Sequence, residues 1–222
     1  MDYLNTIERN LLKWAYRKPF NNNLIIKSLI FIGDGPFWII LFFIISSSGL
    51  LLNNENMYQL SIMLMIGFLL SNIIFTYCKK NIKRKRPYAN KELHRILELH
   101  IENRDPGHGS KESESFPSGH VLWTTVCVGI ICFKLGYIYF LFIGWLIPVM
   151  IFLRLHLGVH YPSDVLAGLV IGIINFIITV LIFPEVMNFL NSYRHYSLFN
   201  YGYILLVLFI VFFGYKSWSK RV

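Results

Sequence analysis

Charged side chains are scarce in this sequence of 222 residues, where they make up 15% of the chain against 55% hydrophobic and 17% aromatic residues. This balance excludes an ordinary water-soluble domain, because the long apolar runs lack the regular polar face of an amphipathic helix or strand. Cysteine is also scarce. Cys78, Cys127 and Cys132 are odd in number and match no common zinc spacing, so we expect neither a disulfide framework nor a zinc site.

Several apolar runs approach or exceed the ~20 residues that cross a bilayer as a helix. They predict an all-α, polytopic membrane protein, in which residues 1–222 form one domain with six transmembrane helices. The expected spans are 37–52, 57–78, a third that begins after His120 and ends near Phe133, 135–153, 165–183 stopped by Pro184, and 201–215. We expect 185–200 to be polar or interfacial.

Acidic residues are few, and the net charge is +9. In a membrane protein this excess of positive charge indicates anionic headgroups or anionic substrates as partners, and not nucleic acid. The first twenty residues carry several charges and lack an apolar core, so we expect no cleavable signal peptide.

The segment 1–23 predicts an amphipathic helix, because Leu4, Ile7, Leu11 and either Trp14 or Ala15 recur at helical spacing with basic residues between them. Such a helix can lie in the membrane interface. A soluble helix packed on the loops is an equal alternative. Further on, Gly33-Asp34-Gly35-Pro36 predicts a turn or a broken helix, and we expect Asp34 to cap the span that follows.

The only long polar stretch runs from Lys79 to Ser118, and its part 103–115 predicts a loop because it shows no periodicity. Each span reverses the side of the membrane on which the chain lies. The end of the second span, the start of the third, the end of the fourth and the start of the fifth must therefore share one face. These four junctions carry 79–87, 117–120, Arg154 and 160–164, so polar motifs far apart in sequence are expected to meet there.

The residues gathered on that face suit the chemistry of phosphate. They are Lys79, Arg86, Ser118, the Gly119 amide, His120, Arg154, His160 and Asp164. Two arginines and a lysine can neutralise a phosphate dianion and its transition state. Pro-Ser-Gly before a helix offers a hydroxyl and free backbone amides. An imidazole beside a carboxylate suits a nucleophile, and a second imidazole suits a general acid.

These motifs resemble the signature of the type 2 phosphatidic acid phosphatase superfamily, PAP2. The resemblance is carried by Lys79–(six residues)–Arg86-Pro87, Pro117-Ser118-Gly119-His120 and Arg154–(five residues)–His160–(three residues)–Asp164. It implies His160 as nucleophile, Asp164 as its partner and His120 as general acid. The implied phosphate-binding residues are Lys79, Arg86, Ser118, Gly119 and Arg154. Leu153 stands where the family usually has Ser.

The chain lacks a carboxylate cluster that would hold Mg²⁺ or Zn²⁺, so we expect no metal and no other cofactor. The expected activity is hydrolysis of a lipid phosphate monoester through a phosphohistidine. A lipid A 4′- or 1-phosphate is the first substrate expected, because the basic loop suits a multiply phosphorylated headgroup. Phosphatidylglycerophosphate, phosphatidic acid and undecaprenyl pyrophosphate remain alternatives, as do a lipid phosphotransferase and a non-catalytic lipid-binding protein.

We expect a multi-pass protein of the bacterial cytoplasmic membrane, with the lipid phosphate and the bilayer as its partners. The side on which the site faces stays open. All but Lys134 and Arg194 of the 21 lysines and arginines fall on the site face, which predicts a cytoplasmic site. The resemblance favours the periplasm instead.

Overall fold

The computed structural model describes residues 6–20, 23–105 and 114–193, together with Leu205 and Phe212. In this part of the chain the structure is helical, and it holds no strand beyond an isolated antiparallel bridge between Lys85 and Glu114. The helices are α1 (Thr6–Arg17), α2 (Leu24–Gly33), α3 (Gly35–Leu51), α4 (Glu55–Asn81), the 3-10 helix η1 (Pro87–Ala89), α5 (Lys91–Leu97), α6 (Gly119–Leu135), α7 (Tyr139–Ile143), α8 (Leu146–His156) and α9 (Pro162–Tyr193). The all-α prediction is confirmed for these residues.

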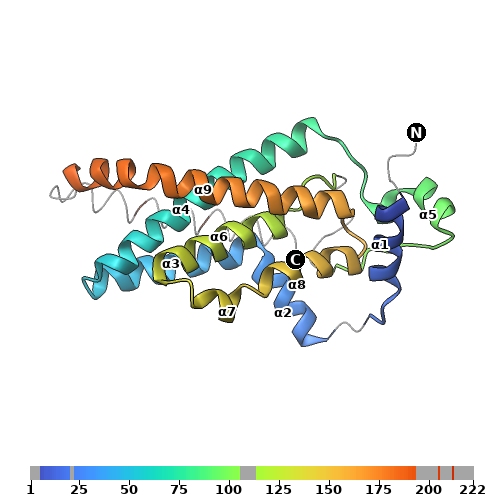
Figure 1. Ribbon diagram of the computed structural model, residues 1–222, viewed down its shortest axis with the longest axis horizontal. Helices are drawn as coiled ribbons and strands as arrows, with labels where there is room; N and C mark the ends of the chain where they lie inside the picture. The colour runs from blue at the N-terminus through green and yellow to red at the C-terminus, as the bar shows by residue number, and fades with distance from the viewer. Residues whose placement is uncertain (1–5, 21–22, 106–113, 194–204, 206–211, 213–222) are drawn as a thin grey trace.

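The long helices run along the length of the molecule, and α1 and α5 lie at one end of it (Figure 1). The main apolar core lies between α3, α4, α6 and α9, where Trp38, Ile62, Val126 and Ile130 are buried. A second apolar cluster joins α8 to α1, α2 and the start of α9. The second cluster therefore fixes α1 to the end of the bundle at which α9 begins.

Three described helical stretches are long and apolar enough to cross a membrane, namely Glu55–Asn81, Tyr139–His156, which joins α7 to α8, and Pro162–Ser192. Four spans result if α2 and α3 count as one broken helix. The chain bends by 71° between Gly33 and Gly35, at the predicted break. The predicted third span, α6, is an apolar helix of 17 residues, and the fourth is divided into α7 and α8. The predicted sixth span, 201–215, falls almost wholly outside the described residues.

The prediction that Pro184 ends a helix is wrong, because α9 continues through Pro184 to Tyr193. Proline removes one backbone N–H, but a helix that packs on its neighbours can tolerate that loss. Met187 is buried in the main core, and Val186 and Leu190 pack against the same core. Packing of the segment after Pro184 therefore outweighs the missing hydrogen bond.

Helix α1 packs on the rest of the protein through one face and leaves a second apolar face exposed. Leu12, Ala15 and Tyr16 are buried, and the Ala15 carbonyl contacts His156 Nδ1 at 2.9 Å. The other face carries Ile7, which is 77% exposed, and Trp14, which is 53% exposed. The buried face fits the second alternative, a helix packed on the rest of the protein. The exposed face has the apolar stripe expected of the first alternative, an interfacial helix.

The polar stretch between α4 and α6 holds more structure than its sequence predicts. It contains η1 and α5, where Asn90 caps α5 by accepting a hydrogen bond from the Leu93 N–H. Leu93 and Leu97 of α5 are buried against Leu12 and Tyr16 of α1. The loop is therefore fixed to α1 at its middle. Of the predicted loop 103–115, only 103–105 and 114–115 are described, and these residues form no helix.

Candidate active site

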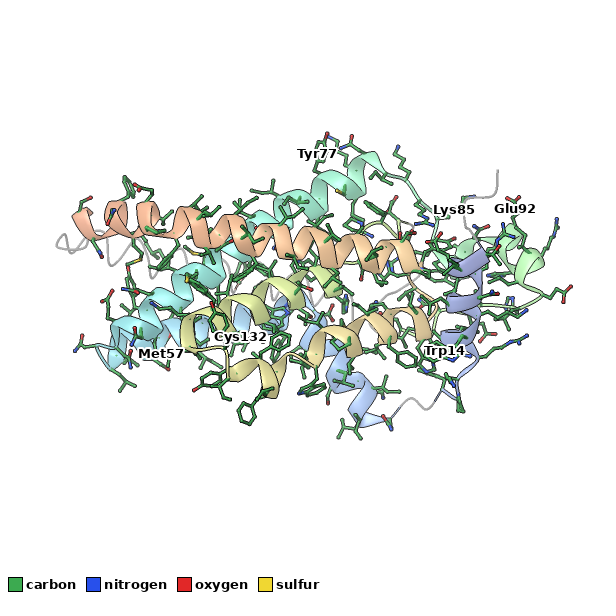
Figure 2. The ribbon with its side chains drawn as sticks, viewed as in Figure 1. Trp14, Met57, Tyr77, Lys85, Glu92 and Cys132 are labelled. Atoms are coloured by element: carbon green, nitrogen blue, oxygen red, sulfur yellow. The ribbon has the colours of Figure 1, made fainter. Side chains whose placement is uncertain are left out.

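The four predicted junctions meet at the α1 end of the bundle. In Figure 2, Lys85 lies at this end, close to α1, whereas Met57 and Cys132 lie toward the other end. Backbone hydrogen bonds join the segments. The Ser118 N–H donates to the Asp164 carbonyl at 3.0 Å, and the Ser115 N–H donates to the Arg84 carbonyl at 2.8 Å. The segments just after α4, just before α6 and at the start of α9 are therefore in direct contact.

His160 lies in the short connection between α8 and α9 and is buried. The connection turns at Gly158, whose φ of +71° lies in the left-handed region that favours glycine. Its Cβ position is also filled, since a Cβ there would lie 2.7 Å from Ile101 Cγ2. This turn brings His160 back to the bundle, with Nδ1 at 3.6 Å from Asp164 Oδ2. Nε2 is left as the nitrogen on the other side of the ring.

The Asp164 carboxylate is shared among several groups. Its Oδ1 accepts a hydrogen bond from Arg84 Nη1 at 2.8 Å, and its Oδ2 accepts one from the Tyr161 N–H at 2.8 Å. Arg84 also stacks over the Tyr161 ring at 4.0 Å. Asp164 is completely buried, so the charge of Arg84 compensates a carboxylate that would otherwise be costly to bury. His160 thus shares this carboxylate with Arg84 and the Tyr161 N–H.

Positive charge surrounds His160. Burial lowers the pKa of His160 well below its ordinary 6.5, and the charges of Arg86, Arg154, Lys79 and His120 lower it further, in that order. An imidazole in such a field is neutral at pH 7, with a lone pair available for attack. The electrostatic effect also shows that the predicted basic residues and His120 lie around one imidazole.

The three basic residues are held by different partners. Arg154 is completely buried and donates from Nη2 to Asp105 Oδ2 at 2.6 Å. Its Nε and Nη1 have no hydrogen-bond partner among the described residues. Arg86 is buried and reaches the Val159 carbonyl at 3.5 Å, and Lys79 Nζ donates to the Glu114 carbonyl. The two donors of the buried Arg154 guanidinium that lack a partner among the described residues favour an anionic ligand.

Ser118 and Gly119 form the start of α6. Both are buried, and in the described residues no hydrogen-bond partner is found for Ser118 Oγ. A Cβ at Gly119 would lie 2.9 Å from Phe75 of α4. On the other side Gly168 of α9 packs so closely that a Cβ there would lie 2.7 Å from the Ser118 carbonyl. The first turn of α6, with its free N–H groups, is therefore held between α4 and α9.

His120 contacts Asp34, a residue predicted from the sequence to cap the following helix. Its Nε2 lies 3.1 Å from Asp34 Oδ1, and both side chains are largely buried. The prediction that Asp34 caps the following helix is wrong for its side chain, which makes no capping hydrogen bond to α3. The reason is the 71° bend, which directs the carboxylate to α6. All eight predicted site residues thus lie at this end of the bundle, and Asp34 joins them.

Three charged residues of the site have no part in the motifs on which the prediction was based. They are Asp34, Arg84 and Asp105. Arg84 stands two residues before Arg86 in an extended segment, where alternate side chains share a side, and this spacing was a usable signal. Asp105 and Asp34 offered no such signal, because each lies far in sequence from its partner.

Two remaining residues have packing roles. His156 contacts the Ala15 carbonyl and stacks on Phe152 with 5.5 Å between ring centroids. Leu153, at the position where Ser is usual, packs in the second apolar cluster with Ile30 and Met150. Within the described ranges, no group of three or more His, Cys, Asp or Glu is arranged to hold a metal ion.

The chain is similar to known proteins in sequence and in fold. Residues 57–188 match the model of the PAP2 superfamily. The bacitracin transport permease protein BcrC of Bacillus licheniformis is 30% identical over 118 residues, which cover 50% of this chain and 49% of that protein. The match therefore spans about half the length of that relative.

Two solved structures have a similar fold. The structure of LpxE from Aquifex aeolicus has a TM-score of 0.60 at 17% identity, and the match covers 81% of this chain and 98% of that one. The first transmembrane PAP2 type phosphatidylglycerolphosphate phosphatase from Bacillus subtilis has a TM-score of 0.63 at 18% identity, and the match covers 83% of this chain and 90% of that one. At these identities the likeness concerns the fold.

Proposed function

Because this chain belongs to the PAP2 superfamily, we propose that it is a membrane phosphatase that hydrolyses a phosphate monoester of a lipid headgroup. The observation that carries the proposal is the surroundings of His160. A buried imidazole is kept neutral by burial and by the charges of Arg86, Arg154 and Lys79. A phosphate dianion would offset the mutual repulsion of these cations. Its phosphorus would also meet a nucleophile that is already deprotonated.

The reaction proceeds in two displacements. His160 attacks phosphorus through Nε2, because Nδ1 faces Asp164. As the N–P bond forms, the bond from phosphorus to the lipid oxygen breaks, and His120 gives that oxygen its proton. Water then attacks the phosphohistidine and passes a proton to the now neutral His120. Inorganic phosphate leaves, and both histidines return to their starting protonation states.

The phosphate oxygens are bound by the basic residues and by the start of α6. Lys79, Arg86 and Arg154 neutralise the charge, while the Ser118 hydroxyl and the Gly119 amide donate hydrogen bonds. Because three cationic side chains supply the positive charge, the reaction needs no metal ion. Activity is therefore expected to persist in EDTA, and loss of activity that Mg²⁺ restores would contradict this part of the proposal.

For the substrate we favour a lipid A 4′- or 1-phosphate. The proposal is supported by the basic residues of the loop after α4, which suit a headgroup with more than one phosphate. Phosphatidylglycerophosphate is the second candidate, because the chain has a fold similar to that of the Bacillus subtilis phosphatidylglycerolphosphate phosphatase. Phosphatidic acid and undecaprenyl pyrophosphate belong in the same test, because the proposed chemistry serves them equally.

The membrane arrangement belongs to the proposal as well. The chain is an integral membrane protein, and we propose one domain with six spans in the cytoplasmic membrane. We also propose that α1 lies in the membrane interface through its exposed Ile7, Leu11 and Trp14. Lys18 Nζ lies over the Trp14 ring at 5.1 Å, which would suit a headgroup region. The relaxation of a nitroxide spin label at position 11 should be accelerated more strongly by a lipid-soluble paramagnetic agent than by an aqueous one.

The deciding experiment measures phosphate release by the purified full-length protein from the four candidate lipid phosphates. His160→Ala and His120→Ala are tested beside it. A wild-type rate far above both variants on one substrate supports the proposal and identifies that substrate. An acid-labile, base-stable phosphoenzyme in the wild type alone would support the phosphohistidine. Equal rates in wild type and His160→Ala would overturn the proposed function, and release that requires an acceptor lipid would indicate a phosphotransferase.

A further inference from the structure

The break between α2 and α3 fits closely around His120. Gly33 packs on the imidazole so tightly that a Cβ there would lie 2.7 Å from His120 Cδ2. Asp34 follows in an extended conformation, with φ −80° and ψ 149°, and Gly35 and Pro36 then begin α3. The bend of 71° therefore occurs where the chain meets this histidine.

Asp34 occupies the N-cap position of α3 without acting as an N-cap through its side chain. An aspartate at this position usually accepts a hydrogen bond from the N–H of the second or third helical residue. Here no such bond forms, and Oδ1 lies 3.1 Å from His120 Nε2. The Asp34 side chain is 14% exposed and that of His120 is 4% exposed, so little water screens the contact. The carboxylate thus serves the imidazole and not the helix.

We infer that Asp34 is a positioning residue that orients His120 and keeps it protonated, so that His120 presents Nδ1 as the proton donor to the leaving lipid oxygen. The inference rests on the proposed function, since it gives His120 a proton to deliver. A carboxylate next to one nitrogen stabilises the imidazolium and fixes the ring. His120 lies with Lys79, Arg86 and Arg154 around His160, so a group of opposite charge beside it is needed to offset these cations. Asp34 lies outside the residues 57–188 that match the family model.

The variant Asp34→Asn separates this role from a structural one. Asparagine has the same shape and caps helices as well as aspartate does, so a purely structural role predicts little change. If Asp34 acts through His120, kcat on a lipid phosphate should fall by about 10- to 100-fold while KM stays within about twofold, because only proton donation is impaired. Glu55→Gln, the same chemical change in the first turn of α4, is the matched control.

The leaving group supplies the specific readout. The aryloxide of an aryl phosphate with a good leaving group departs without a proton, so Asp34→Asn and His120→Ala should each slow its release in the first turnover by less than about threefold. The ratio of the two rates is taken within one preparation, so partial loss of folded protein cancels. In a His120→Ala background, Asp34→Asn should have no further effect on either substrate. Asp34→Glu should recover part of the lipid-phosphate rate.

The outcomes distinguish this inference from the function on which it rests. If the wild type releases no phosphate from any of the substrates, the proposed function fails and the inference falls with it. If the wild type is active and His120→Ala is slow, but Asp34→Asn hydrolyses the lipid phosphate like the wild type, only the inference is overturned. Equal losses on both substrates, or losses that add to those of His120→Ala, would likewise overturn it.

Discussion

The α2–α3 break and the α8–α9 connection each bring an aspartate to a histidine, yet the two pairs differ in what else the aspartate contacts. Asp164 binds Arg84 and the Tyr161 N–H and stands 3.6 Å from His160. Asp34 stands 3.1 Å from His120. In the first pair a cation offsets the carboxylate, and the field of Arg86, Arg154 and Lys79 favours a neutral ring. The same two residue types can therefore serve as nucleophile in one place and as acid in the other.

The largest effect expected is the difference between the two histidines when the leaving group is good. His160→Ala should abolish hydrolysis of lipid and aryl phosphates alike, by at least ~10⁴-fold, because the covalent intermediate cannot form. His120→Ala should lower the lipid-phosphate rate by about 10²–10⁴-fold but leave most of the rate of aryloxide release in the first turnover. Rates of leaving-group release from the two substrates test this. Equal profiles for the two variants would show that the pairs do not have separate roles.

Arg84→Gln should make the Asp164–His160 pair resemble the Asp34–His120 pair, because the carboxylate then favours a protonated imidazole. Without Arg84 the buried charge of Asp164 is less compensated, which should lower the free energy of unfolding by about 1–3 kcal/mol, a value reduced because Arg84 is 23% exposed. The freed carboxylate should also favour the protonated His160. The acid limb of kcat/KM should therefore move to higher pH. Thermal unfolding and a pH profile check both effects. Lys83→Gln, a change at an exposed neighbour, is the matched control.

The pH dependence of stability tests the neutral state of His160. Its pKa in the folded protein lies below its ordinary 6.5, so below pH 6.5 the unfolded chain binds a proton that the folded protein does not. Stability should then fall as the pH decreases from 6.5 toward the folded-state pKa, by at most about 1.4 kcal/mol per pH unit from this residue. The His160→Gln variant should lose less stability than the wild type between pH 7 and 5. An equal or larger loss would contradict a neutral His160.

The smallest effect is expected at the contact between α1 and the segment that carries Asp164. Glu8 Oε1 accepts a hydrogen bond from the Ser163 N–H at 3.0 Å, which caps the start of α9 from another helix. Glu8→Ala should lower the free energy of unfolding by about 0.5–1 kcal/mol, and Glu8→Gln by less because its carbonyl oxygen still accepts. Thermal unfolding of both variants measures the difference. A larger loss in Glu8→Gln than in Glu8→Ala would contradict the cap.

The sequence predicted those site residues that belong to local motifs or that are brought to one face because each span reverses the side of the membrane. Arg154, His160 and Asp164 lie within eleven residues, and the topology of the spans was enough to bring Ser118 and Lys79 to them. The partners of these residues could not be predicted in the same way. Asp105 reaches Arg154, and Asp34 reaches His120, through packing of segments that share no sequence signal.

The fold shows the same division. The apolar runs predicted α3, α4, α6 and the start of α9 with small errors. Pro184 misled the prediction because local propensity favours a break, whereas burial of Met187 in the core keeps the helix continuous. Helix α5 was missed because it has only seven residues, too few for a period to emerge. Its stability comes from Leu93 and Leu97 against α1, which depends on tertiary structure.

The continuity of α9 also governs how the protein can adapt to membranes of different thickness. Its 32 residues give a length of roughly 48 Å, whereas the hydrocarbon layer of a bilayer is about 30 Å deep. Asp164 lies at the first turn, and the surplus turns that follow Pro184 lie at the opposite end. A thicker or thinner bilayer can therefore be accommodated where the helix projects, while the end that carries Asp164 keeps its depth relative to the headgroups.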